Sequence, residues 1–484
     1  MKSGGRLEPI VYLKPLEKAA TVPRNTLNRN SPALNSLNRA ATQQRSTTSR
    51  KLDLILILYP DGDSNCGRAM IASADDSEPE APALRRSIGF WLLVLYGMGT
   101  MVGAGFFALS GEVAGEAGMQ APLAFGLAGL LALFSALAFA ELSSRIPHAG
   151  GSARYLETAF NQRWLSAAAG WMIITTGIVS AATLAVATIR FLGDFIDVPH
   201  DLTIVAVTLS LGAIAAWGVK QAVGLVVGIC IVQIATLAYV TVAALGAPDA
   251  PVREVSALMP SLDTATWIGI LGAAFLAFYA FIGFEDMVNM AEEVHDVRRS
   301  MPRALVLSLL LTTALYIVVS AALVLSIPTA ELAAAGTPLA EAVRHHGDLA
   351  VGAIGVVSIL SAVNSALVQI VMAARVGYGM ANRGYAPGFL ATIGRRSRTP
   401  WVGTVLATLL VVVLAVSFDL TTLANATSGV LLAVFATVNF GLWWMKGVDG
   451  DRLPEGQFSL PRFVPLLGAL VSAAALIVKL VQVF

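Results

Sequence analysis

Charge is scarce in this chain. Only 13% of its 484 residues are charged, while 56% are hydrophobic and the mean hydropathy is +0.72. Soluble domains carry about 25% charged residues, so this composition excludes an ordinary soluble fold and indicates an integral membrane protein. The net charge of +1 provides no strongly basic surface, and we expect no nucleic-acid partner.

Cysteine and histidine are also scarce. Of the two cysteines, Cys66 lies in a polar segment and Cys230 in a hydrophobic one, without the CxxC spacing of metal or redox motifs. The five histidines fall in predicted loops or at predicted helix ends. A clustered set of nucleophile, base or metal ligands is therefore missing, and the sequence predicts no enzyme, no metal site and no cofactor.

The first 85 residues differ from the rest. They are rich in Asn, Ser, Thr, Arg and Pro, and their one apolar run, residues 52–59, is too short to cross a bilayer. This composition predicts a disordered, cytoplasmic extension over residues 1–85. Met70 is an alternative start, because an acidic stretch and then Arg85 and Arg86 follow it before the first apolar segment.

Long apolar segments fill residues 86–484, the second predicted domain. Most have roughly the 20 residues that a helix needs to cross a bilayer. Basic residues gather in the loops on one side, which predicts a cytoplasmic N-terminus. We expect the protein to lie in a plasma membrane or a bacterial inner membrane. We predict eleven spans, near 88–111, 121–144, 164–192, 203–218, 221–246, 266–290, 303–327, 350–382, 401–417, 420–445 and 462–484.

Two of these spans are interrupted by glycine. GTMVGAGFFAL contains Gly103 and Gly105, and about 180 residues later FLAFYAFIGFEDMVNMAEEV contains Gly283. A helix that unwinds inside lipid leaves backbone groups unsatisfied unless a solute, an ion or water takes them up. Paired interruptions in two halves of a membrane protein therefore predict a transporter's binding site, although a GxG pair alone also suits helix packing.

Four stretches carry a resemblance to the amino acid–polyamine–organocation permeases. They are GTMVGAGFFALSG, AELSSRIPHAGGSARYL, FYAFIGFEDMVNMAEEVHDVRRSMPRAL and VNSALVQIVMAARVGYGMANRGYAP. The resemblance covers residues 86–484 and implies an all-α, LeuT-like fold with two inverted five-helix repeats. The repeats would occupy about 88–246 and 266–445, with an extra helix at 462–484. Most members of the family carry twelve spans, so a missing twelfth span stays open.

The first interruption is a candidate site for a substrate carboxylate. A half-helix starting near Phe106 offers free N–H groups and the positive end of its dipole. Gly103, Ala104 and Gly105 would form the cradle, because glycine lets the backbone approach a substrate closely. Family members often have a hydroxyl residue where this chain has Ala104.

The second interruption is a candidate site for the substrate's ammonium group. Carbonyls around Tyr279, Ala280 and Ile282 would receive it where the helix unwinds before Gly283. The resemblance places Tyr279 where the family has an aromatic gate over the substrate. The alternative for Tyr279 is an ordinary buried aromatic whose hydroxyl is satisfied.

Three polar residues are candidates for coupling or gating. Glu285 follows the second interruption, and its counterpart in the family has been linked to gating or proton sensing; the alternative is a structural carboxylate. Glu141 ends the second span near Arg145, which favours an ion pair. Gln233 stands where the resemblance to cationic amino acid transporters implies a lysine that substitutes for sodium. A neutral amide does not titrate near neutral pH, so the lysine mechanism is absent. Transport could instead be coupled to H⁺ or to Na⁺, or it could be an exchange.

Further polar residues in the spans are candidates for selectivity. Hydroxyls in membrane helices more often bond their own backbone than a substrate. No acidic residue clearly lines the predicted pocket at side-chain depth, which favours neutral amino acids. The selectivity candidates are Thr176, Asn364, Gln369 and Asn425.

These features predict a secondary active transporter that moves amino acids, or related organic amines, through the lipid bilayer by alternating access. Two alternatives remain. One is an amino acid sensor with the same fold that does not transport, and the other is an exchanger of cationic amino acids or polyamines. The oligomeric state is not predicted.

Overall fold

The computed structural model describes residues 10–11, 20–21, 54–59, 68–73, 88–147, 151–196, 199–217, 223–247, 254–394, 399–448 and 457–483. It divides into two compact units, Met1–Leu84 and Arg85–Phe484. In the first unit, β1 (Ile10–Val11) pairs antiparallel with β2 (Ala20–Thr21), and β3 (Leu54–Tyr59) with β4 (Arg68–Ser73). The disorder predicted for residues 1–85 otherwise concerns residues outside the described ranges. It stays a prediction, as does the alternative start at Met70.

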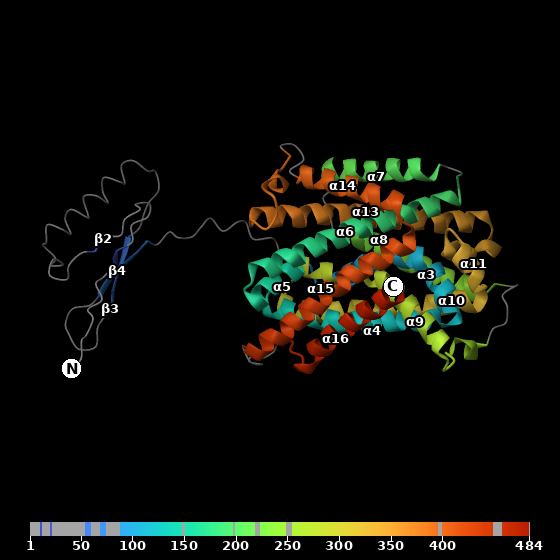
Figure 1. The fold of residues 1–484 in the computed structure, drawn as a ribbon, viewed down its shortest axis with the longest axis horizontal. Helices are drawn as coiled ribbons and strands as arrows, with labels where there is room; N and C mark the ends of the chain where they lie inside the picture. Colours follow the sequence, from blue (N-terminus) through green and yellow to red (C-terminus); the bar gives the residue numbers. More distant parts are fainter. Residues whose placement is uncertain are drawn as a thin grey trace. The chain divides into compact units, whose positions relative to one another are not determined.

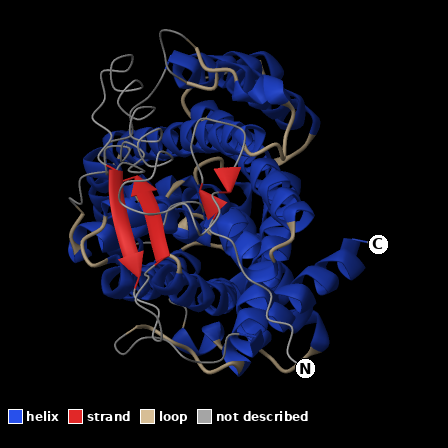
Figure 2. Cartoon of the chain, turned by 90° about the vertical axis from the view of Figure 1, so that its left-hand side faces the viewer, coloured by secondary structure: helices blue, strands red, loops and turns tan. Residues whose placement is uncertain are grey.

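The second unit is built of helices. Figure 2 shows only helices and loops in its described residues. The long helices are α2 (Phe90–Met101), α3 (Ala104–Ala117), α4 (Ala121–Arg145), α5 (Gly151–Phe160), α6 (Arg163–Gly193), α7 (His200–Trp217), α8 (Val223–Leu245), α9 (Thr264–Ala277), α10 (Val297–Ser326), α13 (Asp348–Asn382), α14 (Trp401–Ser417), α15 (Leu420–Val448) and α16 (Phe463–Val483). The short ones are η2 (Gly118–Gln120), η3 (Val255–Leu258), η4 (Phe278–Phe281), η5 (Phe284–Glu293), α11 (Thr329–Ala334), α12 (Pro338–Glu341), η6 (Arg344–His346) and η7 (Gly388–Ala391).

Each predicted span coincides with one helix or with one interrupted helix. The first predicted span is α2 followed by α3, and the sixth is α9 followed by the 3₁₀ helices η4 and η5. Among the described residues, nine helical stretches are long and apolar enough to cross a membrane, and α2 and α14 are shorter apolar helices. The all-α membrane fold predicted from the sequence is therefore confirmed.

Helices at equivalent places in the two halves pack on each other. α4 packs against α10, α6 against α13, and α7 against α14. Figure 1 shows α7, α13 and α14 along one edge of this unit, and α4, α9 and α16 along the opposite edge. Pairing of each helix with its counterpart is expected when two similar halves are related by a two-fold axis.

A glycine lies in each of these three contacts. A Cβ on Gly129 of α4 would stand 2.5 Å from the side chain of Thr313 on α10. Gly170 of α6 meets Met380 of α13 in the same way, and Gly212 of α7 meets Thr408 of α14. Small residues let membrane helices approach closely, because packing rather than hydrophobic burial holds them together in lipid.

The two interrupted helices begin differently. Asp263 caps α9, and its side chain accepts a hydrogen bond of 2.8 Å from the backbone N–H of Thr266. Hydrogen bonds from the hydroxyls of Ser261 and Thr266 hold the pKa of the Asp263 carboxyl well below its usual range. The residue before α2, Gly89, makes no side-chain cap. The start of α9 is thus fixed by a charged group, and the start of α2 is not.

Candidate functional site

The first interruption separates α2 from α3 by two residues. α2 ends at Met101, Val102 and Gly103 leave the helical conformation, and α3 begins at Ala104. The sequence prediction placed the start of this half-helix near Phe106, two residues too late. The first N–H groups of α3 have no partner within their own helix. The break lies where the glycines predicted it, and Gly105 belongs to the first turn of α3.

The second interruption is longer and changes the type of helix. α9 passes into η4, Ile282 is extended, and Gly283 has a φ of +125° before η5 begins. Only glycine adopts such a φ without strain. A Cβ on Gly283 would also stand 2.5 Å from the carbonyl oxygen of Thr100 on α2. The N–H of Gly283 donates to Oε2 of Glu285 over 2.9 Å, so this carboxylate satisfies an amide that the interruption exposes.

The two interruptions lie against each other. A Cβ on Gly105 would stand 3.0 Å from Cα of Ala280 and 3.3 Å from Cδ1 of Tyr279. On its other side, a Cβ on Gly103 would stand 2.8 Å from Oγ of Ser365 on α13. The fold therefore brings the two predicted half-sites together. The space beside Gly105 is occupied by η4.

Tyr279 connects the second interruption to α6. Its hydroxyl lies 2.9 Å from Oγ of Ser180 and donates to the carbonyl oxygen of Ser180 over 3.2 Å. The side chain is only 4% exposed. This contact joins a broken helix to a continuous one.

Tyr316 is a residue at the interruptions that the sequence interpretation missed. Its hydroxyl lies 2.8 Å from the carbonyl oxygen of Met101 and 3.0 Å from that of Ala280. Its ring stacks on Phe106 with a centroid distance of 4.4 Å. A lone tyrosine inside an apolar span was the available signal, because a buried phenol usually has a hydrogen-bond partner.

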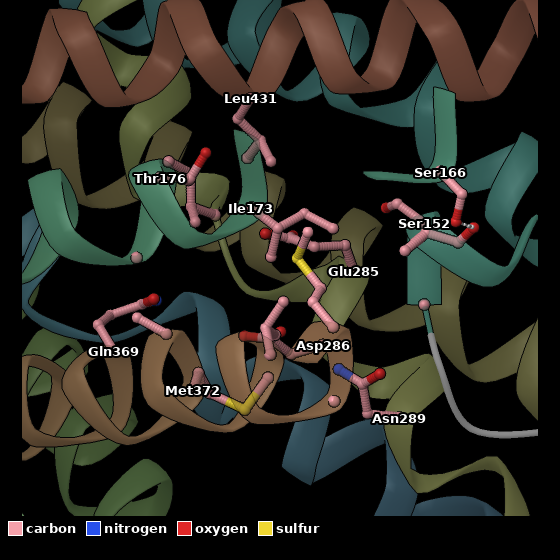
Figure 3. Close-up of a pocket in the computed structure, with 18 of the residues that line it drawn as sticks. Ser152, Ser166, Ile173, Thr176, Glu285, Asp286, Asn289, Gln369, Met372 and Leu431 are labelled. Carbon is pink, nitrogen blue, oxygen red and sulfur yellow. Dashed lines mark hydrogen bonds between the residues drawn. The ribbon is translucent and has the colours of Figure 1, made fainter. Parts of the chain in front are cut away.

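A cavity of about 220 Å³ lies beside the second interruption. Figure 3 shows side chains of η5, α6, α13 and α15 around it, with Glu285 and Asp286 pointing toward its middle. Its lining includes four of the predicted residues, Thr176, Ile282, Glu285 and Gln369. Ten others are not among the lining residues, namely Gly103, Ala104, Gly105, Glu141, Gln233, Tyr279, Ala280, Gly283, Asn364 and Asn425.

The acidic lining corrects one expectation. The sequence interpretation placed no acidic residue clearly at side-chain depth in the pocket, yet Glu285 and Asp286 both line the cavity together with the amide of Asn289. The two carboxylates are neighbours because they are consecutive residues of the first turn of η5, directly after the break at Gly283. The argument for neutral substrates that rested on a missing acid is therefore wrong.

The cavity reaches the surface at the α5 end of the unit. Arg383 lines it with a side chain that is 50% exposed, and Nη1 of Arg383 lies 3.3 Å from Oε2 of Glu157 on α5. The hydroxyl of Tyr385, another lining residue, lies 3.4 Å from Oε1 of Glu157. The guanidinium of Arg163 stands over the Tyr385 ring, 5.4 Å from its centroid. Charged and aromatic side chains thus frame this opening.

A second charged pair lies at the opposite end of α6. Nη1 of Arg190 is 2.6 Å from Oε1 of Glu112 on α3, and the two side chains are 29% and 26% exposed. Glu112 lies in α3, after the first interruption, and Tyr279 lies in η4, at the second. Both have their partner on α6. The same continuous helix is therefore joined to both broken ones.

Glu141 is fully buried in a cluster of its own. Its Oε1 accepts hydrogen bonds from Nη2 of Arg145 over 2.6 Å and from Nζ of Lys446 over 2.7 Å. Its Oε2 accepts a hydrogen bond from the N–H of Leu460 over 2.8 Å. A buried charge with several donors is stabilised by them. This arrangement contains the expected ion pair with Arg145 and adds a link from α4 to the end of α15.

Gln233 joins α8 to α13. Its Nε2 donates to Oγ of Ser361 over 2.8 Å, and its side chain is 2% exposed. Cys230, one turn earlier, meets α2 at Gly99, where a Cβ would stand 2.9 Å from it. The amide therefore lies in the layer behind α2. Among the selectivity candidates, the hydroxyl of Thr176 donates to the carbonyl oxygen of Met172 on its own helix.

The family described as amino acid permease matches residues 88–483. The chain belongs to this family. Its members are transporters rather than enzymes, as the resemblance of the four stretches implies.

Three relatives show the breadth of the permease family. An uncharacterized transporter of Mycobacterium tuberculosis is 30% identical, over 81% of this chain and 87% of the relative. The branched-chain amino acid permease BcaP of Bacillus subtilis is 27% identical, over 66% and 72%. The human cationic amino acid transporter 4 is 28% identical, over 74% and 59%.

A solved structure shows the same fold. The crystal structure of MhsT in complex with L-phenylalanine aligns with a TM-score of 0.55 and 16% identity, over 82% of this chain and 99% of MhsT. At this identity the similarity establishes the fold alone. The permease thus has the LeuT-like fold that the resemblance implies.

Proposed function

We propose that this permease is a secondary active transporter that moves amino acids or closely related organic amines by alternating access. The observation that carries the proposal is the meeting of two interrupted helices beside a cavity that carries two carboxylates and reaches the surface at one end. Interrupted helices at this depth provide free backbone donors and acceptors for a solute. A cavity of about 220 Å³ suits a small molecule rather than a peptide.

The two ends of a zwitterion have separate candidate partners. The carboxylate would bind the first turn of α3 at Gly103, Ala104 and Gly105, where N–H groups and the helix dipole favour an anion. The ammonium would bind carbonyls of η4 and, from the cavity, the carboxylates of Glu285 and Asp286. Because Ala280 and Tyr279 pack against Gly105, binding at the first turn requires η4 to move away from α3.

Alternating access is supported by contacts at the two ends of α6. The basic residues of the loops favour a cytoplasmic α5 end, so the cavity would be open to the cytoplasm. At the other end of α6, Glu112 pairs with Arg190, and near the middle of α6 Tyr279 bonds Ser180. We propose that these two contacts close the external path and break when the substrate enters from outside.

A cationic substrate is the second candidate, favoured by the acidic lining. Two carboxylates on one cavity would attract the positive side chain of a cationic amino acid or one end of a polyamine. The relatives carry names of both substrate classes, branched-chain and cationic. Their names therefore leave both candidates in place.

Uptake into proteoliposomes tests the function. Purified full-length protein would be assayed with each of the twenty labelled L-amino acids and with putrescine, and proton and sodium gradients would be imposed separately. Saturable uptake of an amino acid is the expected result. Acceleration by internal amino acid without an effect of either gradient would identify exchange. Tight binding without uptake would indicate a sensor instead of a transporter. The absence of both binding and uptake would refute the proposal.

A further inference from the structure

Tyr316 is wedged between the two interrupted helices. It lies in the middle of α10 and is completely buried. Its ring stacks on Phe106 of α3 at 4.4 Å and 13°, and it meets Phe281 of η4 edge-on at 5.2 Å and 65°. The ring therefore contacts α3, which follows the first interruption, and η4, which lies in the second.

The hydroxyl of Tyr316 reaches two carbonyls that the interruptions leave without their usual partners. Met101 is the last residue of α2, and Ala280 lies in η4 just before the extended Ile282. In a continuous α-helix these carbonyls would accept the N–H of the residue four positions later, Gly105 and Phe284. The chain turns away at both places, and the tyrosine oxygen lies 2.8 Å and 3.0 Å from the two carbonyl oxygens instead.

One hydroxyl carries one hydrogen, which two carbonyl oxygens share. Sharing is favourable only while both oxygens stay within hydrogen-bond distance of the same point. Because one carbonyl belongs to α2 and the other to η4, the shared hydroxyl ties the separation of the two breaks to its own hydrogen-bond distances. Loss of the hydroxyl leaves two buried carbonyls to find other donors, and such groups are costly in a dry interior.

Burial alone does not explain this arrangement. Tyr155 on α5 is also almost fully buried, at 1% exposure, and packs on Phe139. Among the described residues its hydroxyl has no hydrogen-bond partner. A buried tyrosine in this protein therefore does not automatically find a carbonyl, and the two carbonyls at Tyr316 are a feature of the interruptions.

We propose that Tyr316 is a positioning residue whose hydroxyl holds the two interrupted helices in register for substrate binding. It acts through the backbone, since it is not among the residues that line the cavity. The part of this proposal that concerns substrate rests on the proposed function; the part that concerns the order of the backbone does not.

Hydrogen exchange separates the two parts. Tyr316→Phe removes the hydroxyl and keeps the ring, and Tyr155→Phe is the matched control, since it removes a buried hydroxyl without a partner. In purified full-length protein, we expect peptides covering 98–107 and 278–286 to exchange about tenfold faster in Tyr316→Phe. In Tyr155→Phe both peptides should exchange as in the wild type. Unchanged exchange at both interruptions in folded Tyr316→Phe would overturn the proposal.

Two further results decide between the hydroxyl and its surroundings. Phe106→Leu keeps the hydroxyl and removes the stacked ring, so a rise in exchange equal to that of Tyr316→Phe would assign the effect to ring packing and refute the proposal. Failure of Tyr316→Phe to fold while Tyr155→Phe folds would show a general structural role and also refute it.

Transport supplies the second readout. With labelled L-leucine and L-arginine as probes in proteoliposomes, Tyr316→Phe should raise KM about tenfold and change kcat less than about twofold. A fall in kcat at constant KM would contradict positioning for binding. If the wild type takes up neither probe, the proposed function is in question for these substrates, and the exchange experiment still decides the role of Tyr316.

Discussion

The two interrupted helices differ in the backbone conformation of their breaks. Between α2 and α3 the chain leaves the helix for two residues, and the helix after the break is again an α-helix. After α9 the chain passes through a 3₁₀ turn, an extended residue and a glycine at φ +125° before a second 3₁₀ helix. The first break is packed against protein, and the second borders the cavity. We therefore expect the second candidate half-site, which borders the cavity, to be the more adaptable one and the first to be the more rigid.

The largest effect is expected at Gly283. Gly283→Ala forces a side chain onto a positive φ and against the Thr100 carbonyl, which together cost roughly 2–6 kcal/mol. We expect uptake in proteoliposomes to fall at least about thirtyfold. Gly384→Ala is the control, because Gly384 has a φ of +73° and nothing within 4 Å of its Cβ position. Equal losses in both variants would show that the approach to α2 is unimportant.

Gly105 tests the packed half-site. Gly105→Val fills the first turn of α3 against Ala280 and Tyr279, and overpacking of this kind should raise KM about tenfold to a hundredfold. The control is Gly228→Val on α8, where nothing lies within 4 Å of the Cβ position. A wild-type KM in Gly105→Val would remove this turn from the carboxylate site.

Asp286 tests the adaptable half-site. Asp286→Asn removes one negative charge from the cavity with little change in shape. If the substrate is cationic, uptake of labelled L-arginine should fall about tenfold relative to that of L-leucine. Asp201→Asn is the control: its carboxylate is exposed, with a side chain that is 77% exposed, and the ratio of L-arginine to L-leucine uptake should stay unchanged. Parallel loss of both probes would instead assign Asp286 to the ammonium group that all amino acids share.

A smaller effect is expected where the second half-site meets α6. Tyr279→Phe removes the hydrogen bond to Ser180, worth about 0.5–1.5 kcal/mol. This should change the apparent affinity from the outside by roughly twofold to tenfold. Ser180→Ala removes only the contact with Oγ and keeps the carbonyl, so its effect should be no larger than that of Tyr279→Phe, and the double variant should not exceed Tyr279→Phe. Additive effects would mean that the two residues act separately.

The smallest effect concerns the capped start of α9. The pKa of Asp263 is lower in the folded protein than in the unfolded chain, so the cap stabilises above the unfolded pKa and is lost as pH falls through the folded one. The melting temperature of Asp263→Ala should lie slightly below that of the wild type from pH 6 to 8. The gap should begin to narrow as the pH falls below about 3.9 and should close only at the much lower folded pKa. A gap that widened in acid would contradict the cap.

Local sequence features predicted much of this fold. Length and hydropathy located every span, because a helix in lipid must satisfy its own backbone over about 20 residues. Gly103 and Gly283 located the breaks, although only Gly283, with a φ of +125°, has a backbone conformation that requires glycine. The sequence also predicted Thr176, Ile282, Glu285 and Gln369 as site residues, and these line the cavity. Their roles stay predictions.

Contacts between distant segments explain what the sequence interpretation missed. Asp286 reaches the cavity from the first turn of η5, and hydropathy does not predict which side chains of that turn face α6 and α13. Tyr316 meets carbonyls 36 and 215 residues away. Gly105 was placed at an open cradle, whereas η4 occupies that space. Such pairings depend on how helices stack, which a single sequence does not specify.

The Glu141 cluster has a consequence for how the chain assembles. Lys446 and Leu460 follow Glu141 by more than 300 residues, so both are synthesised long after α4 has formed. Arg145 lies one helical turn from Glu141 and supplies a positive charge from the start. The carboxylate thus has a counter-ion on its own helix from the start and keeps it in the folded protein. It acquires its full set of donors only when the end of α15 and the segment at Leu460 arrive, which makes their docking against α4 a late step of biogenesis.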